Sequence, residues 1–144
     1  MIPRGKLVVD ASVAMKWYLP EDGSAEASTL LEHPGPLIAP DLLIAEFGNV
    51  IWKRARKGEL SHAEAEEIID AFISSGPVEL WPASLFLRPA FDIAFRWQLT
   101  VYDSLYLALA LAEDCPLITA DSRFSQGLRG TLLEKSILLL GGRS

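Results

Sequence analysis

The chain has 144 residues, half of them apolar, which suits a globular protein with one sizeable core, and we expect residues 1–144 to form a single domain. Its net charge of −6 argues mildly against a surface built for broad electrostatic binding of nucleic acid. The longest apolar stretch, residues 105–112, is too short to span a bilayer, and no cleavable signal peptide is recognisable. These two observations lead us to expect no membrane segment. The single cysteine allows no internal disulfide, which suits a reducing cytoplasm, and we expect a cytoplasmic protein.

Strand-like and helix-like segments alternate along the chain. In the first half of the chain, the pattern predicts a strand at 6–10, helices at 11–18 and 22–32, a strand around Leu37, and helices at 41–57 and 61–75. In the second half, it predicts a strand at 78–81, helices at 83–98 and 103–114, a strand at 116–120, a helix at 122–128 and a strand near Ile137. This alternation indicates an α/β fold in three α/β/α layers, with a central parallel sheet of four to five strands. Such sheets place their sites at the carboxyl ends of the strands.

Local signals refine three of these helices. Asp41 is expected to cap the helix at 41–57, and Ser61 with Glu64 is expected to form a capping box at the start of the next helix. Pro89 is expected to kink or break the helix that contains it.

Four acidic residues stand in apolar frames, where a carboxylate is costly unless something compensates it. Asp10 and Asp121 follow predicted strands, Asp103 begins a helix, and Glu46 lies inside a helix with Asn49 and Lys53 on the same face. Four carboxylates in one pocket repel each other and require cations. The pattern therefore predicts a divalent-metal site.

Simpler interpretations exist for each of these residues. Asp10 and Asp103 could be turn or capping residues, and the other two acids could be solvated, but their joint placement favours a shared site. Ser12 and Thr119 could orient carboxylates, although a capping role is slightly favoured for both hydroxyls. The basic run at 53–57 suits either a solvated helix end or a phosphate contact. The four tryptophans could stack on bases, but packing in the core or at an interface is favoured for most of them.

The segments VVDASVAMKWYLPEDGS, PDLLIAEFGNVIWKR, YDSLYLALA and LITADSRF, in this order and spacing, resemble the PIN-domain ribonucleases, and among them the VapC-type toxins of type II toxin–antitoxin pairs. The resemblance runs from residue 8 to residue 124 and implies a PIN-like fold. According to this resemblance, the four acidic residues of the family's active site correspond to Asp10, Glu46, Asp103 and Asp121 in this chain. The supporting positions that it implies are Ser12, Asn49 and Thr119. Ser104 stands where the family often has alanine, and a small residue still fits there.

This resemblance implies an endoribonuclease that hydrolyses RNA with Mg²⁺ or Mn²⁺, both of which prefer oxygen ligands. We expect Asp10 and Asp103 to bind the principal ion, and Asp121 to hold it through water or to share a second ion. Glu46 would complete the cage or orient the attacking water. The resemblance also implies a cognate antitoxin protein, an RNA substrate and a homodimer, and a hydrophobic groove for the antitoxin is expected near residues 17–31.

Two other classes of protein deserve comparison. A phosphotransfer domain of the haloacid type would need Asp-x-Asp, but Ser12 stands two residues after Asp10, and no nucleotide-binding glycine loop appears. A non-catalytic, PIN-like module that only holds a partner remains the alternative. A complete acidic set favours the enzyme over this module.

Overall fold

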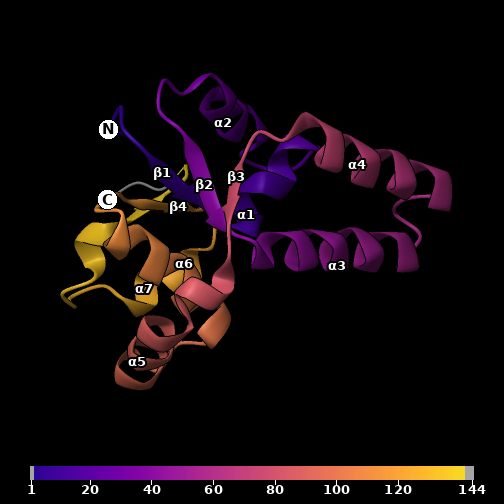
Figure 1. The fold of residues 1–144 in the computed structure, drawn as a ribbon. Helices are drawn as coiled ribbons and strands as arrows, with labels where there is room; N and C mark the ends of the chain where they lie inside the picture. Colours follow the sequence, from indigo (N-terminus) through magenta and orange to yellow (C-terminus); the bar gives the residue numbers. More distant parts are fainter. Residues whose placement is uncertain (1, 142–144) are drawn as a thin grey trace.

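The protein is described by a computed structural model that covers residues 2–141, and its centre is a sheet of five parallel strands (Figure 1). The strand order is β3-β2-β1-β4-β5. The strands are β1 (Leu7–Val9), β2 (Leu37–Pro40), β3 (Glu79–Trp81), β4 (Leu117–Thr119) and β5 (Ile137–Leu139). Because every pair is parallel, all carboxyl ends lie along one edge of the sheet.

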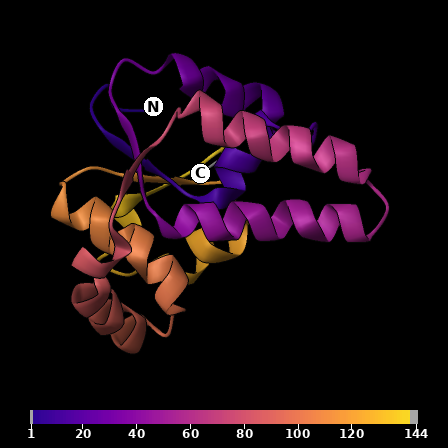
Figure 2. The same cartoon turned by 45° about the vertical axis from the view of Figure 1, so that its right-hand side comes forward.

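Within residues 2–141, seven α-helices flank this sheet. They are α1 (Ala11–Ala14), α2 (Ser24–Thr29), α3 (Leu42–Arg56), α4 (His62–Ser75), α5 (Leu87–Trp97), α6 (Val101–Ala112) and α7 (Ser122–Gly127). In Figures 1 and 2, α1 to α4 lie on one side of the sheet and α5 to α7 on the other. The expected three-layer α/β/α fold is confirmed. Between residues 2 and 141, no helix has the length and apolar character that crossing a membrane requires.

The helix α6 lies at the centre of the core. Its residues from Ser104 to Ala110 are all buried, so it lacks the polar face of a surface helix. It packs against β1, β2 and β4 on the middle of the sheet. This fixes the start of α6, and with it Asp103, beside the carboxyl ends of those strands.

The helices α3 and α4 form an arm that extends away from the sheet, and they lie side by side in both ribbon views (Figure 2). A second apolar cluster stabilises this arm, in which the rings of Phe47 and Phe72 stack at 4.0 Å and Tyr18 meets both rings edge-on. The expected capping box is present, because Glu64 N–H donates to Ser61 Oγ and Ser61 N–H donates to Glu64 Oε1.

Several predicted helix limits were wrong for local reasons. In place of the single helix expected at 11–18, the chain forms the short α1, which is followed by a 3-10 turn at Met15–Trp17. Gly23 adopts a left-handed backbone with φ of 88°, so α2 begins after it rather than at residue 22. The segment 83–98 divides into a 3-10 turn and α5. Pro89 falls in the first turn of α5, where a missing N–H costs little, and it follows the break rather than bending a helix.

One predicted cap and one predicted helix start were also wrong. Asp41 precedes α3 but makes no capping bond; its Oδ1 accepts the N–H of Ala83 at 3.0 Å and so ties the start of α3 to the segment after β3. The helix α6 begins at Val101 rather than Asp103, because Thr100 caps it.

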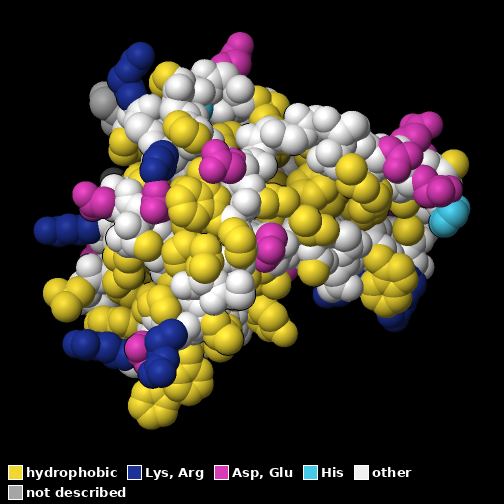
Figure 3. Space-filling model, viewed as in Figure 1, with side chains coloured by type: hydrophobic (Ala, Val, Ile, Leu, Met, Phe, Trp, Pro, Cys, Tyr) yellow, Lys and Arg dark blue, Asp and Glu magenta, His cyan; other side chains and the backbone are white. Residues whose placement is uncertain are grey.

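The outer face of α5 is apolar and exposed. Leu87, Phe91 and Phe95 follow one another at intervals of four residues and are 55, 57 and 75% exposed. Figure 3 shows hydrophobic side chains projecting into solvent in this lower part of the molecule. Exposed apolar side chains that adjoin one another in this way are a feature of interaction surfaces.

Candidate active site

A pocket of about 340 Å³ lies along the carboxyl edge of the sheet, and all four acids of the predicted quartet line it. They come from four separate parts of the chain: Asp10 directly after β1, Glu46 in the second turn of α3, Asp103 in the first turn of α6, and Asp121 after β4. The adjacency of β1 and β4 brings the first and last of these together. Asn49 and Lys53 also line the pocket, as their spacing from Glu46 predicts.

Asp10 is the most buried of the four acids, with 7% of its surface exposed. Ser12 Oγ donates to its Oδ1 and Thr119 Oγ1 donates to its Oδ2, each at 2.5 Å. Its Oδ1 also accepts the N–H of Val13 at 3.3 Å, which makes it the N-cap of α1. Burial raises the pKa of Asp10 to about 6, although these three hydrogen bonds favour the charged form.

The two hydroxyls beside Asp10 do not cap helices, so the favoured interpretation of both was wrong. Ser12 Oγ accepts the N–H of Ala120 at 2.9 Å, and Thr119 Oγ1 accepts the N–H of Asp121 at 3.1 Å. Each hydroxyl can therefore point its proton at the Asp10 carboxylate. Together they tie the first acidic segment to the last one.

Glu46 is held from across the pocket by a residue that the sequence pattern did not single out. The buried Tyr106, on α6, donates its phenol proton to Glu46 Oε1 at 2.6 Å. Burial raises the pKa of Glu46, the Tyr106 bond opposes this rise, and repulsion by Asp103 adds to it. The pKa of Tyr106 is also raised, by burial and then by the Glu46 charge, so the phenol stays a donor.

Asp103 and Asp121 complete the acidic wall. Asp103 N–H donates to Thr100 Oγ1 at 3.1 Å, so Thr100 is the cap and the carboxylate of Asp103 is free of that role. Burial, followed by repulsion from Asp121, raises the pKa of Asp103. Asp121 does cap α7, since its Oδ1 accepts the N–H groups of Arg123 and Phe124 at 3.0 and 3.3 Å. A capping role and a place in the pocket are thus compatible in one carboxylate.

Ser104, where the resemblance leads one to expect alanine, is fully buried beside Asp103. Its Oγ has no hydrogen-bond partner within the described part of the chain. Its small side chain fits the space, and the hydroxyl has no structural role that we can assign.

The donor chemistry of the pocket suits a hard divalent cation. Its acidic groups offer only oxygen ligands. The raised pKa values of Asp10, Glu46 and Asp103 reflect burial together with repulsion from a neighbouring carboxylate, which a cation would relieve. Across residues 2–141, no three acidic, histidine or cysteine side chains are arranged so that they could hold a metal as they stand. The roles of the four acids as ligands stay a prediction.

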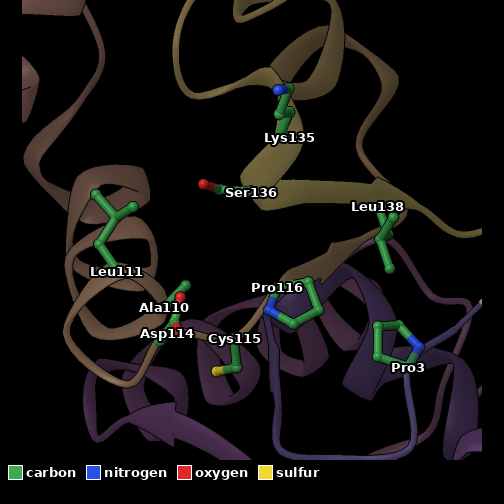
Figure 4. A pocket seen from close by; sticks show the side chains of 9 residues that line it. All are labelled: Pro3, Ala110, Leu111, Asp114, Cys115, Pro116, Lys135, Ser136 and Leu138. Carbon is green, nitrogen blue, oxygen red and sulfur yellow. The ribbon is translucent and has the colours of Figure 1, made fainter.

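A second pocket, of about 380 Å³, lies at the opposite end of the sheet (Figure 4). Pro116 and Ser136 line it just before β4 and β5, so it faces the amino ends of the strands. Its thiol and its amine, from Cys115 and Lys135, lie at opposite ends of the pocket, and Asp114 is its single carboxylate. This pocket brings no comparable set of reactive groups together.

Comparison with known proteins agrees with this geometry. The sequence model of the PIN domain matches residues 7–127. Ribonuclease VapC3 of Pyrobaculum aerophilum is 34% identical over 124 residues, which cover 84% of this chain and 93% of that protein. The crystal structure of PAE2754 from Pyrobaculum aerophilum has a TM-score of 0.64 at 26% identity and covers 89% of this chain and 83% of its own.

The same fold occurs in a toxin–antitoxin complex from Klebsiella pneumoniae, with a TM-score of 0.59 at 13% identity, covering 92% of this chain and 95% of that one. At this identity the likeness concerns the fold alone. The family model and ribonuclease VapC3 carry the assignment, and the matched residues of the family model include the segments that supply all four acids. The chain belongs to the PIN-domain family.

Proposed function

We propose that this chain is a divalent-metal-dependent endoribonuclease and the toxin of a toxin–antitoxin pair. The observation that carries the proposal is the convergence of four carboxylates, from four distant segments, on one pocket of a PIN-domain fold. The relative named ribonuclease VapC3 supports the choice of RNA as substrate. A non-catalytic module would have no use for four repelling carboxylates in a partly buried pocket.

The residues divide the work as follows. Asp10 and Asp103 would hold the principal ion. Asp121 would hold it through water or share a second ion, and Glu46 would complete the cage or orient the attacking water. Mg²⁺ or Mn²⁺ bound there would polarise a phosphate oxygen of the RNA and would lower the pKa of a bound water, so that this water could lose its proton near neutral pH. The cation is the cofactor of this proposal, and either ion fits the oxygen donors.

The neighbouring polar groups keep these carboxylates in place. Ser12 and Thr119 fix both oxygens of Asp10, and Tyr106 fixes Glu46. Asn49, one turn beyond Glu46 on α3, is placed to contact substrate or to support the carboxylates. Fixed ligands bind a metal better than mobile ones, because less ordering accompanies binding.

The test is cleavage of total RNA, and of a circular RNA that exonucleases cannot degrade, by the purified chain freed of any partner. We expect cleavage with Mn²⁺, none with EDTA, and none by Asp10→Asn. A chain that cuts linear but not circular RNA would be an exonuclease. A chain that neither cuts RNA nor binds Mn²⁺ would be the partner-binding module.

The assembly follows from the same proposal. The partners are a cognate antitoxin and a second copy of the chain, and the exposed stripe on α5 is the face that we assign to the homodimer. The groove expected near residues 17–31 has less support, because Trp17 packs on the core and donates to Ala27 O at 2.8 Å. A cytoplasmic, single-domain protein of residues 1–144 completes the proposal.

A further inference from the structure

Four side chains on the outer half of α3 form one continuous patch. Asn49, Trp52, Lys53 and Arg56 are each three or four residues from two others, so they are neighbours on the helix surface. Asn49 and Lys53 also line the acidic pocket. This α3 patch therefore begins inside the pocket and continues outward along the arm.

The aromatic member of the α3 patch is open to solvent. Trp52 is 53% exposed, so it does not pack in the core, one of the two places expected for most of the tryptophans. The guanidinium carbon of Arg56 lies 5.3 Å from the centre of its ring. This cation–π pair presents two flat groups together at the surface, an arrangement on which a nucleobase can stack.

The cations around Trp52 are concentrated, and most of them form no ion pair with a described residue. Four of the 13 lysines and arginines of this acidic chain fall within residues 53–57. Arg54 pairs with Glu21 at 2.7 Å and with Glu59 at 3.6 Å, whereas none of the other three has an ion pair with any residue that the structure describes. Figure 3 shows lysine and arginine side chains gathered at the lower right, beneath the outer end of the arm.

We infer that the α3 patch binds an unpaired stretch of RNA and leads its backbone into the acidic pocket. A base stacks on Trp52 and the Arg56 plane, and Lys53 contacts the phosphate next to the pocket. The inference rests on the proposed function and adds a substrate-binding surface to it. Duplex RNA fits poorly, because its base faces are buried in the helical stack.

RNA suits this surface better than a protein partner does. The α3 patch offers one exposed aromatic ring among cations, whereas the α5 stripe offers three large apolar side chains in a row. Protein interfaces have apolar centres that are depleted of charge. Unpaired cations beside a stacking platform are instead the features of single-strand binding sites.

The first experiment measures binding without cleavage. The full chain in EDTA is titrated against a fluorescein-labelled RNA of twelve unpaired nucleotides and against its duplex, and binding is followed by anisotropy. We expect tighter binding of the single strand, and a Trp52→Ala variant with a Kd raised roughly tenfold or more. We expect Lys53→Gln to reduce the slope of log K against log salt by about 0.7.

The chain offers a matched control. The guanidinium carbon of Arg96 lies 5.2 Å from the centre of the Trp97 ring on α5, so Arg56→Ala and Arg96→Ala each remove a guanidinium from a cation–π pair of similar distance. Only Arg56→Ala is expected to weaken RNA binding, and Trp52→Phe should retain most of the affinity that Trp52→Ala loses. Thermal unfolding confirms that each variant is folded.

The outcomes separate this inference from the proposed function. If Trp52→Ala, Lys53→Gln and Arg56→Ala bind the single strand as Arg96→Ala does, the α3 patch is not the RNA site, even if the wild-type chain cuts RNA with Mn²⁺. Equal binding of duplex and single strand also overturns the inference. So does loss of an oligomer by Trp52→Ala in light scattering, because the surface is then a protein interface.

Discussion

The phenol of Tyr106 donates a hydrogen bond of 2.6 Å to Glu46 Oε1 and so joins α6 to α3 across the acidic pocket. Burial and the adjacent carboxylate raise the pKa of Tyr106, so it keeps its proton at any working pH. Because this bond already restrains the Glu46 side chain, metal binding has less side-chain mobility to remove. Tyr106 is therefore a positioning residue for Glu46.

Tyr106→Phe removes this bond while leaving the ring. We expect the free energy of unfolding to fall by roughly 1 to 2 kcal/mol and Mn²⁺ affinity to fall roughly tenfold, because Glu46 loses its orienting donor. Urea unfolding and calorimetric titration with Mn²⁺ measure the two effects. Tyr102→Phe, on the same helix with a side chain that is 61% exposed, is the control. Equal effects of the two changes would remove the positioning role.

The raised pKa of Asp10 predicts how the stability of the metal-free protein depends on pH. The folded state holds this proton up to about pH 6 and the unfolded state only to about 3.8. The resulting stabilisation is full below pH 3.8 and is lost as the pH rises through 6. The loss amounts to about 3 kcal/mol by linkage.

Asp10→Asn abolishes this titration. In EDTA at pH 7.5 the variant should be more stable than the wild type by about 1 to 3 kcal/mol, and the difference should shrink toward pH 4.5. Urea unfolding at both pH values measures it, with the exposed Asp92→Asn as control. A destabilised variant at pH 7.5 would contradict the burial cost that we assign to Asp10.

Thr119→Val keeps the shape of a buried side chain and removes its hydroxyl. The bond to Asp10 Oδ2 stabilises the charged carboxylate and so opposes the effect of burial on its pKa. Without this bond the pKa of Asp10 rises further, and protons compete better with the metal. We expect Mn²⁺ affinity to fall at least tenfold at pH 6.5 and to recover in part at pH 8. Thr29→Val removes an exposed hydroxyl from α2 and should leave the titration unchanged.

The α5 stripe predicts the oligomeric state. A charge at Phe95 would be buried in a dimer formed through this face, so Phe95→Asp should yield monomers in light scattering. Leu132→Asp places the same charge at a side chain that is 80% exposed but outside the stripe, and this variant should remain dimeric. A wild-type chain that is monomeric at high concentration would remove this face as an interface.

The sequence predicted the fold class and the number of strands well, because buried parallel strands and their turns leave local signals. Asp10 and Asp121 were foreseeable, since a carboxylate one or two residues after a buried strand must lie near its carboxyl end. Glu46 was foreseeable from its position beside the apolar stripe of α3.

Contacts between distant segments were not foreseeable. The Tyr106–Glu46 bond spans 60 residues, and Tyr106 alone looks like one more apolar residue of the most buried helix. The Ser12 hydroxyl looked like a cap because capping is its commonest role at such a turn, but Asp10 already occupies that role. Asp41 likewise follows the capping pattern and instead bonds to a backbone 42 residues away.

The most direct test of the account is RNA cleavage with Mn²⁺ by four variants that each neutralise one carboxylate of the pocket. They are Asp10→Asn, Glu46→Gln, Asp103→Asn and Asp121→Asn. Asp70→Asn, on the exposed side of α4, serves as the control. The account predicts that each pocket variant, still folded, cuts RNA at least 100-fold more slowly than the control variant. Cleavage at the wild-type rate by all four variants would show that this pocket is not the active site.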